Sequence, residues 1–371
     1  MHKVIVVGRG LFGSAATRHL AERSDGILCV GPDEPTNRLT HTGVFGSHYD
    51  EGRMTRVVDP SSEWAVTAKN SIDRYADLET RSGIKFFTPS GYLGIGEPGS
   101  DYNERCAAAG ALVGVATEKL SAIEIRAKFP FLSIDDNADG LLEIGTAGHI
   151  SPRAMVHAQT KLAEMAGAEL VRDEATKICN SANGIEVELA SGKILEADKV
   201  LVATGGFTSA CGLSPVDLGL RVFGRTVVLV KIEGSLTHEL SNMPTIIHCA
   251  SGAYILPPIR YPDENTYLKL GIGTDSDRTF KRLEDLQAWF KGEGSEKNRR
   301  EFTDFITNLI PSLKTCNDWH TNTCAVTQTL SGLPIIDYVD GRKIAVAVGG
   351  NGKGAKGADD WGKIAADLMS S

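Results

Sequence analysis

Three features of the 371-residue sequence predict an α/β fold. Near its start, the apolar run 4–7, a glycine-rich turn, a helical pattern over 14–23 and a second apolar run at 27–30 follow the order of a βαβ unit. Strand and helix patterns alternate again in the middle, and a strand, a glycine-rich loop and a helix close the chain. Together these features predict a Rossmann-like nucleotide-binding domain, with helices covering a parallel sheet.

The same patterns predict the later elements. Helices are expected at 152–166, 283–290 and 359–368, and strands at 170–171, 184–189, 199–203, 225–232, 267–272 and 343–348. From about 215 to 320 the alternation gives way to successive strand-like runs followed by a helix. The length of the whole chain suits two domains. We therefore predict a nucleotide-binding domain at 1–80, 146–212 and 320–371, interleaved with a sheet-rich α+β substrate domain at 81–145 and 213–319.

Composition excludes several classes of protein. Apolar residues make up 42% and charged residues 23%, as in ordinary globular proteins, and the formal charge of −8 disfavours a general nucleic-acid binder. No apolar run is long enough to span a bilayer, so no membrane association is expected. The seven cysteines include no CxxC pair, which predicts neither a disulfide framework nor a metal site and favours a cytoplasmic location.

The first turn carries the pattern G-x-G-x-x-G. Gly8 allows a tight turn, Gly10 lets the backbone approach a pyrophosphate, and Gly13 lets the helix pack close to the strand. Leu11 and Phe12 lie inside the motif, where the first N–H groups of a helix bind phosphate. Its position between a strand and a helix favours a dinucleotide site over an ordinary glycine-rich turn.

The second strand departs from the usual dinucleotide pattern. An acidic residue usually closes this strand and holds the ribose hydroxyls. Here Gly31 stands at that place, so we expect Asp33, or Glu34, to take the role.

Two arginines follow the Ser47-His48 pair. Arg53 and Arg56 are three residues apart, a spacing that puts both guanidinium groups on one face of a helical turn, where they suit a carboxylate. The alternative is a solvated charged turn.

Two more segments carry chemistry-bearing residues. Cys324 lies in the run Thr-Cys-Ala-Val-Thr, and the glycine-rich loop 349–357 contains Gly352, Gly354 and Lys356 before the last helix. The cysteine is either a nucleophile or a buried, inert side chain. The loop is either a ligand-binding turn or a solvated hinge.

These segments resemble the monomeric sarcosine oxidase branch of the D-amino-acid oxidase superfamily over nearly the whole chain. The resemblance implies FAD as cofactor, bound also by Ser47, His48 and the Thr204-Gly205 turn. It implies a thioether from Cys324 to the 8α-methyl group of FAD, with Cys316 as the weaker candidate. It further implies a catalytic Arg53 against the flavin, and Arg56 and Lys356 on the substrate carboxylate. The loop with Gly352, Gly354 and Lys356 is expected to bind the cofactor as well, because its backbone N–H groups suit the negative charge of reduced flavin.

The resemblance implies two further roles on the strand-rich segment. Lys269 matches a lysine that helps reduced flavin react with oxygen, although a lysine between leucines could also face outward. Ile255 and Gly273 stand where the family often has a tyrosine and a histidine, so the amine side of the pocket is expected to differ. Tyr254 is the substrate-binding candidate here.

The expected activity is oxidation of the C–N bond of a small amine or amino acid, N-substituted or cyclic, to an imine, with molecular oxygen reduced to hydrogen peroxide. One alternative is a dehydrogenase of the same fold with another electron acceptor, which peroxide measurement distinguishes. Others are an NAD-dependent oxidoreductase, which would lack flavin absorbance, and a non-catalytic flavin-binding module. Paired Arg53 and Arg56 with Lys356 argue against the last, because a pure binder needs no carboxylate clamp.

Overall fold

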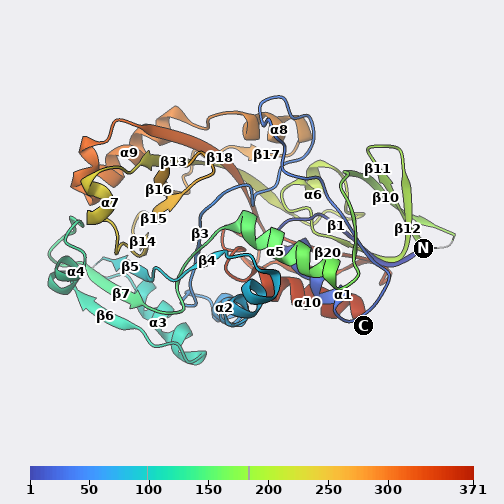
Figure 1. Ribbon diagram of the computed structural model, residues 1–371, viewed down its shortest axis with the longest axis horizontal. Coiled ribbons are helices and arrows are strands. Elements are labelled where there is room, and N and C mark those ends of the chain that lie inside the picture. Colours follow the sequence, from blue (N-terminus) through green and yellow to red (C-terminus); the bar gives the residue numbers. More distant parts are fainter. Residues whose placement is uncertain (98, 183) are drawn as a thin grey trace.

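A computed structural model describes residues 1–97, 99–182 and 184–371. Two large sheets occupy opposite ends of an elongated molecule, and both chain termini lie at the same end (Figure 1). The predicted α/β class, with a Rossmann-like half and a sheet-rich half, is confirmed.

The first sheet has eight strands and contains the N-terminal βαβ unit. Strand β1 (His2–Val7) lies parallel between β12 (Ile194–Val202) and β2 (Ile27–Val30). The other strands are β9 (Glu169–Val171), β10 (Ala175–Ser181), β11 (Gly184–Leu189), β19 (Ile335–Asp340) and β20 (Ile344–Val348). Alternate residues of β1 pack on opposite faces: Val4 and Val6 join a core with α1 (Leu11–Ala21) and α10 (Ala358–Ser370), whereas Ile5 and Val7 join the core behind. Helix α5 (Pro152–Met165) packs beside α1.

The second sheet has nine strands. They are, in spatial order, β17 (Thr279–Phe280), β13 (Arg221–Lys231), β16 (Thr266–Gly271), β15 (Ala253–Arg260), β14 (Thr245–His248), β5 (Tyr92–Gly96), β7 (Asp139–Glu143) and β6 (Glu118–Ser121), with β18 (Trp319–Gln328) paired to β13. One face is covered by α4 (Ala122–Lys128), α7 (Ser235–Glu239), α9 (Glu296–Leu309) and the short helix Pro311–Thr315. The opposite face looks toward the first sheet and carries the candidate site.

A three-stranded sheet joins the two halves. It consists of β3 (Arg53–Thr55), β8 (Gly148–Ile150) and β4 (Phe87–Thr88). The remaining helices are α2 (Ser62–Ser82), α3 (Tyr102–Leu112), α6 (Phe207–Ala210) and α8 (Leu283–Lys291). Since β3 is extended, the helical turn expected at Arg53 and Arg56 is wrong, and residues three apart on a strand point to opposite sides.

The position of β18 changes one predicted boundary. The sequence assigned 320–371 to the nucleotide-binding domain, but β18 is hydrogen bonded to β13 along its whole length, from Arg221–Gln328 to Val230–Trp319. We propose that the boundary follows the sheets and lies just after Gln328.

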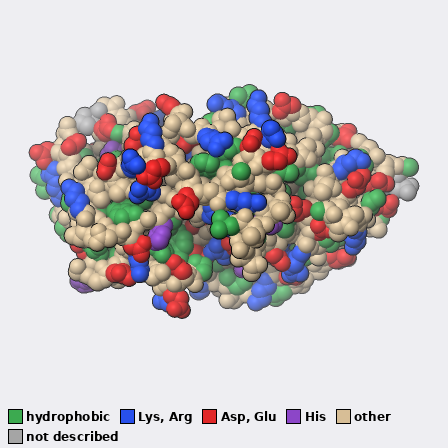
Figure 2. Space-filling view, turned by 90° about the horizontal axis from the view of Figure 1, so that it is seen from above, with side chains coloured by type: hydrophobic (Ala, Val, Ile, Leu, Met, Phe, Trp, Pro, Cys, Tyr) green, Lys and Arg blue, Asp and Glu red, His purple; other side chains and the backbone are tan. Residues whose placement is uncertain are grey.

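The surface mixes charges of both signs. Lys and Arg side chains alternate with Asp and Glu side chains across the face seen in Figure 2. Among the described residues, no helix has the length and apolar character that crossing a bilayer requires. Within the same residues, no group of three or more His, Cys, Asp or Glu side chains could hold a metal ion.

Candidate active site

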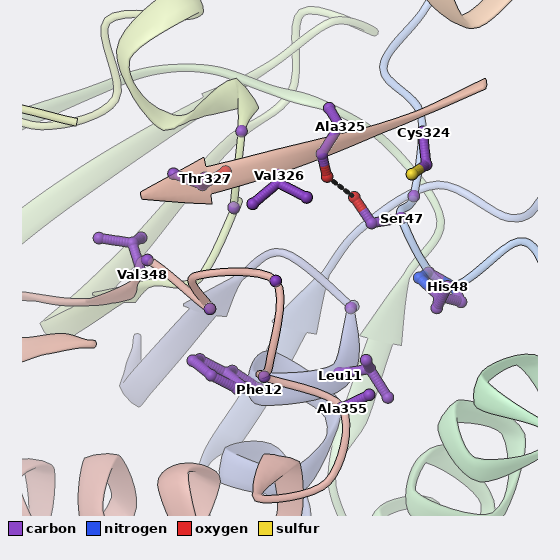
Figure 3. Close-up of a pocket in the computed structure, with 18 of the residues that line it drawn as sticks. Leu11, Phe12, Ser47, His48, Cys324, Ala325, Val326, Thr327, Val348 and Ala355 are labelled. Atoms are coloured by element: carbon purple, nitrogen blue, oxygen red, sulfur yellow. Dashed lines mark hydrogen bonds between the residues drawn. The ribbon is translucent and has the colours of Figure 1, made fainter. Parts of the chain in front are cut away.

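A cavity of about 550 Å³ runs between the two sheets. Its walls include the α1 glycine turn, the Cys324 segment of β18 and the loop 349–356. Figure 3 shows Cys324 to Thr327 on one side, with Leu11, Phe12 and Ala355 on the other. The cavity thus brings together segments from the start, middle and end of the chain.

The glycine turn forms the phosphate-sized end of this cavity. Gly8 has φ +107°, and a Cβ there would lie 2.5 Å from the Ala203 carbonyl oxygen. A Cβ on Gly10 would meet nothing closer than His48 Nδ1 at 4.0 Å, so this backbone is open to a ligand. A side chain on Gly13 would overlap the Gly8 carbonyl. The predicted roles of the three glycines fit this geometry.

Two helices begin at the cavity, and they differ at their N-termini. Gly10, the N-cap of α1, makes no side-chain capping bond, and the first turn holds no acidic residue. The first turn of α10 contains Asp359 and Asp360, both buried and bound to basic side chains such as Arg74. Negative charge already occupies the positive end of α10, whereas that of α1 remains available for an anion.

The ribose prediction does not match the geometry. Asp33 does not line the cavity; its carboxylate pairs with Arg9 and, at 3.1 Å, with Arg172. Glu34 pairs with Arg153. Gly31 is explained by the close passage of the glycine turn, because a Cβ on Gly31 would lie 2.8 Å from the Arg9 amide nitrogen. An acidic side chain at 31 therefore has no room.

The Ser47-His48 pair and the Thr204-Gly205 turn all line the cavity, as predicted. Ser47 Oγ donates to the Ala325 carbonyl at 3.4 Å, which ties this loop to β18 (Figure 3). Burial lowers the pKa of His48 to about 3, so its imidazole is neutral. Gly205 has φ +54°, which favours glycine at this turn.

Cys324 lies on the wall of the cavity. It lines both this cavity and a smaller one of about 200 Å³. Cys316 lines neither and packs against the helix-covered core, where burial raises the pKa of its thiol. Two other cysteines do line the larger cavity: burial raises the pKa of Cys211 to about 11 and that of Cys249 to about 12.

Arg56 and Lys356 meet at a buried carboxylate that the sequence analysis did not identify. Lys356 Nζ donates to Asp59 Oδ2 at 2.7 Å, and Arg56 Nη2 lies 3.8 Å from the same oxygen. Lys353 Nζ binds Asp59 Oδ1 at 2.9 Å. Asp59 is fully buried and does not line the cavity, whereas the three cations do. The Asp59 carboxylate therefore holds the three cations from the side that faces away from the cavity.

The rest of the Arg56 environment holds its guanidinium rigidly. It stacks over the Tyr92 ring at 4.6 Å, and Nη2 donates to the Tyr102 hydroxyl at 2.9 Å. A further Nη1 bond goes to the Val58 carbonyl. Gly352, with φ +73°, and Gly354, which lies close to Gly350, shape the loop that delivers Lys356.

Arg53 and Lys269 meet at a second buried carboxylate, Asp50. Lys269 Nζ and Arg53 Nη1 both donate to Asp50 Oδ2, and the Tyr261 hydroxyl donates to Oδ1 at 3.0 Å. Lys269 is 1% exposed, which rules out an outward-facing side chain. It lines the smaller cavity with Asp50, while Arg53 lines both. Burial, and after it the Arg53 charge, lower the pKa of Lys269 well below its usual value.

Strand alternation corrects the reading of the amine side. Ile255 is buried in the helix-covered core together with Leu270, its partner across the strands. Tyr254 lines the cavity instead, where its ring lies over Gly271. Tyr254, the predicted substrate-binding residue, therefore supplies a tyrosine side chain to the cavity from the position next to Ile255.

Arg225 occupies the space beside Gly273, the position where the family often has a histidine. Gly273 lines the cavity, and a Cβ there would lie 2.9 Å from Arg225 Nη2. Arg225 comes from β13, opposite Cys324, and pairs with Asp277, whose side chain is 1% exposed. Asp50, Asp59 and Arg225 were all missed. The two aspartates lie three residues before Arg53 and three after Arg56, a spacing that could have signalled ion pairs.

The residues present fit a dinucleotide cofactor. Gly8, Gly10 and Gly13 form a cradle that side chains would fill, and the uncapped N-terminus of α1 suits a pyrophosphate. From this end the cavity continues to Cys324 and the loop 349–356.

Comparisons with known proteins agree with this geometry. Residues 3–368 match the model of the family described as "FAD dependent oxidoreductase". The chain is 24% identical to N-methyl-L-tryptophan oxidase of Citrobacter koseri over 372 residues, covering 99% of this chain and 94% of that protein.

Solved structures show the same fold. L-proline dehydrogenase from P. horikoshii superposes with a TM-score of 0.80 at 19% identity, over 100% of this chain and 93% of that one. NikD, described as an unusual amino acid oxidase essential for nikkomycin biosynthesis, gives a TM-score of 0.77 at 19% identity, over 99% and 93%. With the family model matched over nearly its whole length, the chain belongs to the FAD dependent oxidoreductase family.

Proposed function

We propose that this enzyme oxidises the C–N bond of a small amine or amino acid, N-substituted or cyclic, to an imine and passes the electrons to oxygen, giving hydrogen peroxide. FAD supplies the redox chemistry, because it accepts two electrons and a hydrogen from the substrate carbon and returns them to the acceptor. The observation that carries the proposal is the Arg56–Lys356 pair in the cavity that also holds the dinucleotide turn.

The charge balance of that pair supports a carboxylate ligand. Arg56, Lys353 and Lys356 carry three positive charges and Asp59 carries one negative charge, which leaves a surplus of two facing the cavity. Lys353 is partly exposed to water, but Arg56 and Lys356 are buried, and their positive surplus over Asp59 is stabilised by an anion. We propose that Arg56 and Lys356 fix the substrate carboxylate and so orient its amine-bearing carbon.

The amine must be neutral when the hydrogen leaves its carbon, because the nitrogen lone pair forms the new C=N bond. Tyr254 stays a neutral phenol, since burial raises its pKa, and can donate to or accept from the amine. The substrate loses two electrons and two protons in total. Water then converts an open-chain imine to a carbonyl compound and an amine, whereas a cyclic imine can persist.

The oxygen half of the reaction is assigned to the smaller cavity. We propose that Lys269, at its wall, stabilises the negative charge that oxygen acquires with its first electron. Asp50 also offsets this positive charge, an observation that favours the second candidate, a dehydrogenase with another acceptor. The cytoplasmic location predicted from the cysteine pattern stays a proposal.

The test is a panel of amines and N-substituted, cyclic and primary amino acids, read in parallel by peroxide formation and by anaerobic bleaching of flavin absorbance. An oxidase bleaches and forms peroxide with the same substrates. A dehydrogenase bleaches with them but forms peroxide slowly and reduces an artificial dye. Absence of bleaching by every amine would refute both.

A separate proposal concerns covalent attachment of FAD through Cys324. Cys324 is on the cavity wall, whereas Cys316 is not. After acid precipitation, the yellow colour should stay in the pellet of the wild type and of Cys316→Ala but move to the supernatant with Cys324→Ala. A colourless wild-type pellet with free FAD in the supernatant contradicts the linkage.

A further inference from the structure

One wall of the larger cavity carries a cation that the proposed carboxylate clamp does not use. Arg225 projects from β13 on the face that looks into the cavity, and its side chain is 20% exposed. It lies opposite Cys324 on β18.

Two glycines on the cavity side of the sheet leave space for the side chains of Tyr254 and Arg225. Gly271 and Gly273 lie two residues apart on or just beyond β16, and neither has a positive φ, so backbone conformation does not demand glycine there. Added Cβ atoms would lie 2.5 Å from the Tyr254 ring at Gly271 and 2.9 Å from Arg225 Nη2 at Gly273. Both wall side chains therefore occupy space that these glycines leave free.

Among the described residues Arg225 has one ion-pair partner, and its guanidinium carbon also lies 5.6 Å from the centroid of the Phe223 ring. Its Nη1 pairs with Asp277, which is almost fully buried and accepts from the Thr274 amide at 2.9 Å and the Thr274 hydroxyl at 3.1 Å. Among the described residues, no hydrogen bond from Nε or Nη2 of Arg225 is found. Asp277 therefore fixes the guanidinium while the Nε–Nη2 edge, which suits a carboxylate in a bidentate arrangement, stays available.

The two cationic centres lie at opposite ends of the cavity-facing row of the nine-stranded sheet. Arg56 stacks over Tyr92 of β5, and Arg225 belongs to β13. Strands β14, β15 and β16 lie between them, which gives four steps of about 4.8 Å, or roughly 19 Å between the outer backbones. Long side chains from both ends shorten this gap, so one substrate can contact both centres.

We infer that Arg225 is a substrate-selecting residue and that the substrate is an amino acid carrying a second carboxylate on its side chain or N-substituent. The first carboxylate binds Arg56 and Lys356, the second binds Arg225, and the oxidised C–N bond lies between them. This inference rests on the proposed function and narrows its substrate class.

The direct test compares matched substrates in the wild-type enzyme. A series of N-(ω-carboxyalkyl)glycines of increasing chain length is set against the corresponding terminal amides, which keep the shape and remove the charge. We expect kcat/KM for the best diacid to exceed that of its amide roughly tenfold or more, the usual scale for a charge-assisted hydrogen bond. Equal values for acid and amide at every length would overturn the inference.

Variants then assign the effect to this side chain. Arg225→Gln should lower kcat/KM for the acid far more than for the amide and so remove most of the difference between them, and Arg225→Lys should restore part of that difference. Arg221→Gln, an exposed position on the same strand, should keep the wild-type preference. An equal loss for acid and amide in Arg225→Gln would show that the Asp277 ion pair serves only the fold.

A binding measurement separates the two proposals. Saturated diacids of increasing length, with matched monoacids as controls, are titrated while the flavin spectrum is followed. Tighter diacid binding that disappears in Arg225→Gln supports the inference even when turnover is slow. If amino acids bleach the flavin but acid and amide do not differ, only the substrate class is wrong. If none bleaches it, the proposed function itself fails.

Discussion

The two buried aspartates of the site, Asp59 and Asp50, organise cations in different ways. Asp59 serves Arg56, Lys353 and Lys356, and the positive surplus faces the larger cavity. Among the residues that the structure describes, Asp50 serves only two cations, Arg53 and Lys269, and also accepts from the Tyr261 hydroxyl and the Glu51 amide. The Asp59 cluster therefore has charge to share with an anionic ligand, whereas the Asp50 cluster carries a smaller surplus.

The difference follows from the strand between the clusters. Arg53 is the first residue of β3, and Arg56 comes directly after its last residue. Because successive side chains of a strand alternate in direction, side chains three residues apart point to opposite sides. One arginine is directed to Asp50 and the other to Asp59. A pair of arginines that looks like a single clamp in the sequence thus supplies two separate centres.

The largest change in ligand affinity should come from removing a cation of the Asp59 cluster. Arg56→Ala or Lys356→Ala should weaken binding of a simple carboxylate inhibitor by about 2–5 kcal/mol, roughly 30- to 5,000-fold, because each removes a buried charged partner. Titration of the flavin spectrum measures this, with Lys363→Ala on the outer surface of α10 as control. Unchanged binding in both variants would indicate an amine substrate without a carboxylate.

The Asp50 cluster should respond in the other half-reaction. Lys269→Met keeps the length of the side chain and removes its charge, so reoxidation of the reduced flavin by oxygen should slow by about 10²–10³-fold. Anaerobic reduction by substrate should change far less, and stopped-flow traces follow both steps. Lys231→Met on the same sheet is the control. Equal slowing of both steps would assign Lys269 to the fold or to substrate positioning.

The Asp59 carboxylate itself should control the pH range of binding. Burial lowers the pKa of Lys356 to about 8, while Asp59 acts to raise it; Arg56 and Lys353 act to lower it. In Asp59→Asn the raising partner is lost, so Lys356 should lose its proton at lower pH. Carboxylate binding, which needs the ammonium, should weaken near pH 8 by about tenfold while staying comparable near pH 6.

The inhibitor dissociation constant measured from pH 6 to 9 checks this expectation. Asp73→Asn, on the exposed face of α2, should reproduce the wild-type profile. The same loss at every pH in Asp59→Asn would mean that Asp59 supports only the local structure.

The smallest effect is expected at Lys353. Its side chain is 40% exposed, so water screens its contact with Asp59 and the contact contributes less than about 1 kcal/mol. Lys353→Gln should change inhibitor affinity by less than about fivefold. A loss as large as that of Lys356→Ala would make Lys353 an equal member of the clamp.

Local signals predicted much of the nucleotide-binding half. The motif from Gly8 to Gly13 needs only neighbouring residues, and β2, α5 and β11 were placed within a residue or two. The site was harder, because its contacts join distant segments: Lys269 lies 219 positions from Asp50, and Lys356 lies 297 from Asp59. No periodicity encodes which carboxylate receives which cation.

The face of the sheet to which each strand residue points was the other feature that was hard to predict. Tyr254 and Ile255 differ by one position, yet strand alternation sends one to the cavity and the other to the core. Arg225 was missed because its importance depends on the missing side chain of Gly273, just beyond another strand. Such complementarity is visible only when the strands are paired.

The order of strands in the first sheet has a consequence for folding. Strand β20 pairs with β12 in parallel, and α10 packs against α1 so closely that a Cβ on Gly362 would lie 2.8 Å from the Ala16 amide nitrogen. The N-terminal βαβ unit therefore cannot complete its core until residues 344–369 have left the ribosome. Such late, non-local closure slows folding and leaves apolar surface exposed during synthesis.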